Sequence, residues 1–155
     1  MRKFQAKLIS LVHKKEITSR DAALIVLAKD GLKPLSCVGV FSSPRLISIL
    51  REYEIPFAIK NGRIHIGRLA KKQKRDSQNG INFGFPVCCA SVFLNSDDFF
   101  FSENSRHAFS FLSPYIFHIP CSGRCKETKK LAIKYMHHLK ENYPRVANHI
   151  EKNIC

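Results

Sequence analysis

Hydrophobic residues recur at helical spacing in the first part of the chain. In residues 3–14 they share one face of a predicted helix: Phe4, Leu8, Leu11 and Val12. A second helix is predicted directly after it. Thr18 and Asp21 have the spacing of a capping box, and Gly31 is a typical residue at a helix end.

The pattern then changes to that of strands. Residues 35–41 form a run rich in branched residues and predict a buried strand. Ser43 and Pro44 open a short helix, as a cap and a first-turn proline do. In residues 57–66 apolar residues alternate on both sides of Asn61-Gly62, which predicts a two-residue β-hairpin. The first half therefore reads as a small α/β unit.

Residues 71–80 contain no apolar side chain and end in a second Asn-Gly pair, so we interpret them as a linker or exposed loop. A chain of 155 residues is normally one domain. We therefore expect a single domain over residues 1–155, with an α/β sub-domain at 1–70 and a mostly helical one at 81–155.

The second half is predicted to be mainly helical. Pro86 opens a helix that runs to about Leu94, and residues 95–113 show no clean period. Residues 115–119 are interpreted as a strand. A long helix is predicted over 123–142, with Ser122 as its cap and Pro144 beyond its end. The predicted fold class is α+β, with a hairpin-containing N-terminal half and a helical C-terminal half.

Composition narrows the class of protein. The chain is 45% hydrophobic and 25% charged, which is typical of a globular protein. The longest apolar run, residues 22–28, is too short to cross a bilayer. The N-terminus has no continuous apolar segment followed by a cleavage site, so no signal peptide is predicted. We expect a cytoplasmic protein.

The charge is strongly basic and unevenly distributed. The formal net charge is +14. Residues 1–75 hold 17 basic and 5 acidic side chains, whereas residues 76–120 hold 1 and 4, and residues 121–155 hold 8 and 3. Such asymmetry favours contact with a polyanion, nucleic acid first, although solubility alone also explains a basic surface.

Four of the six cysteines stand where thiolates are favoured. Cys88 and Cys89 fall in the first turn predicted after Pro86, and Cys121 and Cys125 flank the start of the long helix. Free N–H groups at a helix N-terminus stabilise a thiolate, the form that binds metals and attacks electrophiles. In a reducing compartment such a group is more often a metal site or catalytic thiol than a disulfide framework.

His118, three residues before Cys121, is a further candidate ligand. Neighbouring helical residues point about 100° apart, so a zinc site is expected to use only one of Cys88 and Cys89, together with His118, Cys121 and Cys125. An iron–sulfur cluster held by the four thiolates is the rival. Disulfides and plainly buried thiols without any cofactor stay open as alternatives.

Residues 84–89 (GFPVCC) and 118–125 (HIPCSGRC), with the lysine-rich helix after them, resemble an uncharacterised archaeal family, the domain of unknown function numbered 483. That family pairs a Gly-aromatic-Pro-x-Cys-Cys motif with a downstream Pro-Cys-Ser-x-x-Cys. The resemblance covers mainly residues 80–143. It implies a small α+β fold and a shared cysteine site, and it implies no activity.

Three functions are therefore considered. The leading hypothesis is a metal- or cluster-organised binding module that contacts nucleic acid through two groups of basic residues: Lys71, Lys72, Lys74 and Arg75, and Lys126, Lys130 and Lys134. The second is a thiol-dependent redox enzyme that uses the same cysteines. The third is a structural or interaction protein whose cysteines are buried or disulfide-bonded and whose phenylalanine-rich segment forms a homo-oligomer contact. No catalytic residue is identified.

Overall fold

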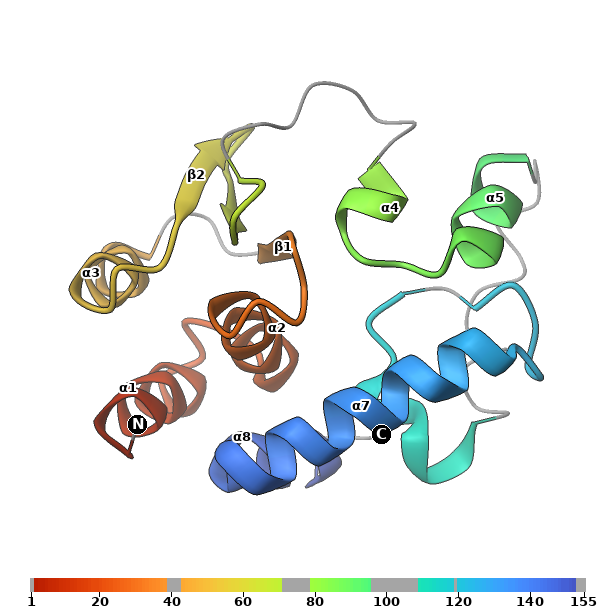
Figure 1. The fold of residues 1–155 in the computed structure, drawn as a ribbon. Coiled ribbons are helices and arrows are strands. Elements are labelled where there is room, and N and C mark those ends of the chain that lie inside the picture. Colours follow the sequence, from red (N-terminus) through yellow and green to blue (C-terminus); the bar gives the residue numbers. More distant parts are fainter. Residues whose placement is uncertain (1, 39–42, 71–78, 96–108, 119, 153–155) are drawn as a thin grey trace.

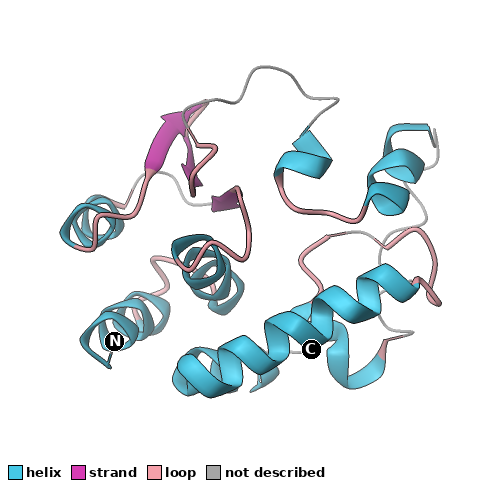
Figure 2. Cartoon of the chain, viewed as in Figure 1, coloured by secondary structure: helices cyan, strands magenta, loops and turns pink. Residues whose placement is uncertain are grey.

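The computed structural model describes residues 2–38, 43–70, 79–95, 109–118 and 120–152. Its fold is α+β, as the sequence predicts. A three-stranded antiparallel sheet lies in the N-terminal half, and the C-terminal half is helical (Figure 2). Among the described residues, no helix is both long and apolar enough to cross a membrane.

Helices α1 (Arg2–His13) and α2 (Ser19–Lys29) open the chain. The predicted capping box at the start of α2 is confirmed. The Thr18 hydroxyl accepts the N–H of Asp21, and the Asp21 carboxylate accepts the N–H of Thr18, each at 3.0 Å. Seven of the eleven residues of α2 are buried, because α2 contacts α1, α8, β1 and β3. This helix is the centre of the core (Figure 1).

The sheet has the order β1-β3-β2, with β1 at Ser36–Val38, β2 at Phe57–Lys60 and β3 at Arg63–Ile66. The predicted hairpin is confirmed. Asn61 and Gly62 both have positive φ, 50° and 72°, as a type I′ turn requires. Helix α3 (Pro44–Glu52) lies between β1 and β2 in the chain and is capped by Ser43, whose Oγ accepts the N–H of Leu46.

The C-terminal half consists of short helices around one long helix. Helix α4 (Asn79–Asn82) and helix α5 (Val87–Asn95) precede the 3-10 helix η3 (Ser110–Tyr115). Helix α7 (Lys126–Asn142) and helix α8 (Pro144–Lys152) then end the described chain. α7 contacts both η3 and α8. The start of α4 lies inside the predicted linker, and residues 71–78 of that linker lie outside the described residues.

Two predictions about this half are wrong. Residues 115–118 do not form a strand: Tyr115 ends η3, and the extended backbone at Ile116 pairs with no strand in the described chain. The long helix begins at Lys126, because Ser122 and Cys125 close a turn in which the Cys125 N–H bonds the Ser122 carbonyl at 3.2 Å. Cys125, not Ser122, is therefore its cap.

The two halves of the sequence are in contact. α8 packs against α2 and α1, so the last described helix covers the first two. The sequence does not predict α8. It predicts that helical structure ends before Pro144, but Pro144 occupies the first position of a new helix. The division into two sub-domains stays a prediction.

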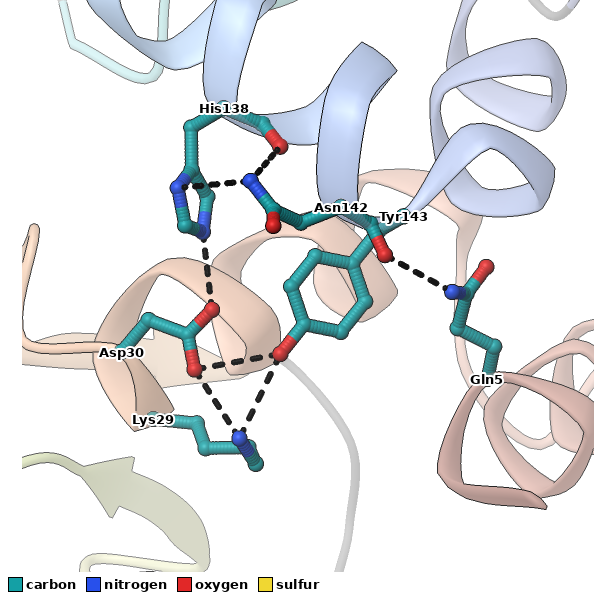
Figure 3. Close-up of polar contacts among 6 residues, drawn as sticks. All are labelled: Gln5, Lys29, Asp30, His138, Asn142 and Tyr143. Carbon is teal, nitrogen blue, oxygen red and sulfur yellow. Dashed lines mark hydrogen bonds and ion pairs between the residues drawn. The ribbon is translucent and has the colours of Figure 1, made fainter. Parts of the chain in front are cut away.

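A polar network ties the C-terminal end of α2 to the junction of α7 and α8 (Figure 3). The Asp30 carboxylate accepts hydrogen bonds from Lys29 Nζ at 2.9 Å and from the Tyr143 hydroxyl at 3.1 Å. His138 Nε2 lies 2.8 Å from the same carboxylate. Burial tends to raise the pKa of Asp30, but these three partners outweigh it, and the net pKa is lowered.

The same network extends to α1. Asn142 Nδ2 donates to the His138 carbonyl at 3.1 Å, and Gln5 Nε2 donates to the Asn142 carbonyl at 2.9 Å. The carbonyls at the end of α7 are therefore paired with side chains from its own last turn and from α1. This contact fixes α7 with respect to the N-terminal helices.

We expect Asp30→Asn to lower the free energy of unfolding by about 1–3 kcal/mol, because it leaves partly buried partners without their charged acceptor. Denaturant unfolding measures this. The pKa of Asp30 is lower in the folded state than its ordinary value of 3.8. Its carboxylate therefore stabilises the fold fully above pH 3.8, and this stabilisation is lost as the pH falls through the folded-state pKa. The difference between the variant and wild type should therefore shrink in acid.

Glu52→Gln is the control, because the Lys7–Glu52 pair is 42% and 47% exposed. It should leave the free energy of unfolding close to that of wild type, because exposed ion pairs contribute little to stability. Equal effects of the two substitutions would contradict a special role for the Asp30 network.

Candidate metal centre

Cys88 and Cys89 lie in the first turn of α5, as predicted. The turn before this helix is tight: Gly84 has a φ of 73°, and a Cβ at this position would stand 3.0 Å from Pro34 Cδ. A side chain is therefore disfavoured there both by backbone conformation and by space. The Cys89 N–H bonds the Pro86 carbonyl at 2.9 Å, which starts the helix with both thiols at its N-terminal end.

Cys121 and Cys125 come from the loop that leads into α7. Cys125 is the N-cap residue, and its Sγ accepts the N–H of Thr128 at 3.5 Å. Sulfur thus takes the place of the usual capping oxygen. The Cys121 N–H points to Cys89 Sγ at 3.4 Å, which connects this loop to α5.

The structure brings the four sulfurs together. The Sγ atoms of Cys88, Cys89, Cys121 and Cys125, here called the thiol cluster, all lie within 4.8 Å of one another. Cys88 Sγ is 3.9 Å from Cys89 Sγ, and Cys125 Sγ is 3.7 Å from each of them. Four sulfurs at the usual zinc–sulfur distance around one tetrahedral ion are separated by about 3.8 Å. The cluster therefore has the dimensions of a single four-thiolate metal site.

Both adjacent cysteines belong to this cluster, although the sequence favoured only one of them as a ligand. The 100° between their directions applies around the helix axis. Cys88 and Cys89 both lie in the first turn of α5, and their sulfurs nevertheless lie only 3.9 Å apart.

The sulfurs have different surroundings. Cys89 and Cys125 are buried, at 2% and 7% exposure, while Cys121 is half-buried and Cys88 is exposed. Thr128 contacts both buried sulfurs: its Oγ1 lies 3.3 Å from Cys89 Sγ, and its N–H donates to Cys125 Sγ. Peptide N–H and hydroxyl donors of this kind stabilise thiolates.

These surroundings separate the pKa values of the thiols. Burial by itself raises the pKa of Cys125, but the Thr128 hydroxyl and N–H, with the neighbouring thiols, more than offset it and lower the pKa to about 7. Burial and the adjacent thiols raise the pKa of Cys121 to about 12, and burial also raises that of Cys89. Without a cation, one thiolate therefore suppresses ionisation of its neighbours. A bound divalent metal would remove that conflict.

His118 lies behind the sulfurs. Its Nε2 is 2.9 Å from Thr128 Oγ1, and its ring stacks on Phe85 with centroids 5.4 Å apart. It is buried and is not part of the group of four ligand atoms. In this arrangement His118 reaches the cluster through the Thr128 hydroxyl, the position of an outer-layer partner that orients metal ligands.

A buried lysine, which the sequence did not single out, supports the turn before α5. Lys33 is 2% exposed, and its Nζ donates to the Phe83 carbonyl at 2.6 Å. The ammonium also lies over the rings of Phe85, at 5.0 Å, and Tyr135, at 5.9 Å. Burial, with the nearby Arg20 charge, lowers the pKa of Lys33 to about 7. The burial of Lys33 is visible only in the structure, because a lysine shortly after a helix-ending glycine such as Gly31 is expected to be exposed.

In the described residues, the predicted basic and phenylalanine-rich groups contribute no ligand atom to the thiol cluster. Lys126, Lys130 and Lys134 are exposed on α7, whereas the predicted group at residues 71–75 lies outside the described residues. In the phenylalanine-rich segment, Phe109 is buried and Phe111 is 69% exposed, and residues 96–108 are likewise outside the described chain. The homo-oligomer contact stays a prediction.

No family model matches the chain, and comparisons with curated proteins and with solved structures find no match either. Membership of the family suggested by the two cysteine motifs therefore stays a prediction. What the cluster does is inferred from its own geometry.

If the thiol cluster binds zinc, Thr128→Val should weaken that binding about 10- to 100-fold, because it removes the hydroxyl that joins His118 to Cys89 while nearly conserving volume. Competition with a chromophoric chelator measures the affinity. The cobalt-substituted protein should also show a shifted thiolate-to-metal absorption band, which a change in packing alone would leave in place.

Thr128→Ser is the matched control, since it keeps the hydroxyl and loses only a methyl group. It should retain affinity close to that of wild type. If both substitutions weaken binding equally, the hydroxyl does not act on the metal ligands.

Proposed function

We propose that this chain is a small metal-organised module in which Cys88, Cys89, Cys121 and Cys125 bind one zinc ion. The observation that carries the proposal is that the sulfurs of Cys88, Cys89 and Cys125 lie 3.7–3.9 Å from one another and that Cys121 Sγ lies within 4.8 Å of all three. These separations fit a tetrahedral four-thiolate site. Four protein ligands leave no open position for substrate, which is typical of structural zinc.

The separations also bear on which cofactor fits. In an iron–sulfur cluster the thiolates are held on different metal atoms, with bridging sulfides between them. Such a core needs more room than sulfurs within 4.8 Å of one another provide. A single iron ion shares the tetrahedral geometry of zinc, so elemental analysis has to distinguish the two metals.

The role that this geometry supports is to hold α5 against the start of α7. Cys88 and Cys89 belong to one helix, and Cys125 caps the other. In the described chain, α5 buries little else in its first turn: Cys89 and Ala90 are its buried residues there. Metal-binding free energy at such a site contributes directly to folding.

The first test is elemental analysis of protein purified without oxygen and without added metal. We expect about one zinc per chain, and we expect Cys125→Ser to lose the metal and to lower the thermal midpoint. Cys37→Ser is the control, because this thiol lies on β1 away from the cluster. Metal-free protein that keeps the wild-type fold would refute the proposal. If the analysis finds iron with inorganic sulfide, the thiols hold an iron–sulfur cluster and not zinc.

A second part of the proposal is contact with the phosphate backbone of nucleic acid. Lys126, Lys130 and Lys134 are all exposed and follow one another at helical spacing on α7. The row starts at the residue after Cys125, so the metal centre would fix its first turn. Lys130 forms an ion pair with Glu127 at 2.8 Å. Among the described residues, no ion pair is found for Lys126 or Lys134.

Binding of labelled single-stranded and double-stranded nucleic acid over a range of salt concentrations tests this part. Each phosphate contact contributes a slope of about 0.9 on a log–log plot for duplex DNA and about 0.7 for single strands. The triple substitution Lys126→Gln, Lys130→Gln and Lys134→Gln should reduce the slope by about 2.7 for duplex DNA and by about 2 for single strands.

The matched control removes the same charge elsewhere, through Lys3→Gln, Lys14→Gln and Lys15→Gln on α1 and just after it, where all three residues are exposed. Equal losses in the two variants would mean that net charge alone attracts the nucleic acid. Binding that does not respond to salt would refute the contact.

A further inference from the structure

One of the four cysteines is exposed at the protein surface. Cys88 is exposed in the first turn of α5, whereas Cys89 and Cys125 are buried. A small oxidant can therefore reach the Cys88 sulfur before it reaches the two buried ones. Four protein ligands leave no coordination position for a substrate on the proposed metal, but the residue Cys88 is exposed to solvent.

The neighbouring sulfurs offer Cys88 a resolving partner. Cys89 is unsuited, because consecutive Cα atoms are about 3.8 Å apart, which is below the range of roughly 4.4–6.8 Å found in ordinary disulfides. Cys125 Sγ lies 3.7 Å from Cys88 Sγ and comes from a different helix. A movement of about 1.7 Å would bring these two sulfurs to bonding distance.

We propose that Cys88 is a site of oxidation by hydroperoxides and that Cys125 resolves it, so that a disulfide between α5 and α7 forms in place of the metal site. This inference rests on the proposed zinc centre. It assigns that centre a chemical response in addition to its structural role.

The chemistry balances with a hydroperoxide as the only oxidant. The Cys88 thiolate attacks the terminal peroxide oxygen; an S–O bond forms, the O–O bond breaks, and the alkoxide or hydroxide leaves and takes a proton from water. The Cys125 thiolate then attacks the sulfur of the resulting sulfenic acid, and hydroxide departs as the S–S bond forms. The two sulfurs lose two electrons, the peroxide gains two, and the zinc keeps its charge.

Zinc release follows from the loss of ligands. After the reaction only Cys89 and Cys121 remain as thiolates, which is half of the tetrahedral set. The disulfide would keep α5 joined to the start of α7, so the helices stay linked while the metal leaves. Thiol reductant and zinc together should restore the original site.

The test uses the full chain with Cys37→Ser and Cys155→Ser, which retains only the four thiols of the cluster. Zinc-loaded protein is treated anaerobically with one equivalent of hydrogen peroxide. Released zinc is read with a coloured chelator, remaining thiols by titration, and bonded peptides by mass spectrometry without reduction. We expect one zinc released, two thiols consumed and a Cys88–Cys125 link.

Two matched variants locate the reaction. Cys88→Ser and Cys121→Ser each remove one ligand of the cluster. Cys88→Ser should slow thiol oxidation about tenfold or more, because the exposed thiol is gone. Cys121→Ser should still form the Cys88–Cys125 link. Oxidation at equal rates in both variants would overturn the assignment of Cys88.

The outcomes separate this inference from the zinc proposal. Bound zinc that survives peroxide with all four thiols intact overturns the oxidation site and leaves the metal site standing. A link from Cys88 to Cys121, or stable sulfinic acid on Cys88, overturns Cys125 as the partner. If the anaerobic protein contains no metal, the zinc proposal fails, and the peptide map of the peroxide-treated chain still decides whether Cys88 and Cys125 react.

Discussion

The approach of four sulfur atoms to within 4.8 Å is the constraint on which the second half of the molecule depends. Burial opposes ionisation of Cys125, but the Thr128 hydroxyl and N–H and the neighbouring thiols lower its pKa, whereas burial and the neighbouring thiols raise the pKa of Cys121. The four thiols at this distance therefore do not all ionise without a cation. In the described residues α5 has little other buried surface in its first turn. A metal ion would convert this electrostatic conflict into the contact that holds α5.

Local signals made the N-terminal half predictable. The capping box at Thr18 and the Asn61-Gly62 turn each depend on a few neighbouring residues, and both are confirmed because no distant contact opposes them. The linker, in contrast, contains the first residues of α4, and Pro144 starts a helix that the sequence had ended there. α8 covers α1 and α2, and α4 contacts α5, and no local sequence pattern records either contact.

The sequence predicts which cysteines form the candidate site, but it does not predict how the surrounding residues are arranged around them. The position of the thiols at two helix starts was visible in the sequence, and the structure brings all four together. The cap at Cys125 was missed because sulfur is an uncommon capping group and Ser122 is a common one. The place of His118 behind Thr128, and the support that Lys33 gives to the Phe83 carbonyl, arise from packing between distant segments.

One physical connection joins the metal centre to the rest of the chain. Cys125 caps α7, whose far end is fixed by the contacts of Asp30 and Gln5 (Figure 3). The helix is therefore held at both ends, by sulfur chemistry at one and by a polar network at the other. In the proposed site, metal binding would order the first turn of α7. A ligand of the exposed lysines that needs this ordered turn would therefore bind more tightly to the metal-loaded protein, and by reciprocity it would strengthen metal binding. The polar network positions the far end of the helix, and the Cys125 cap positions its first turn.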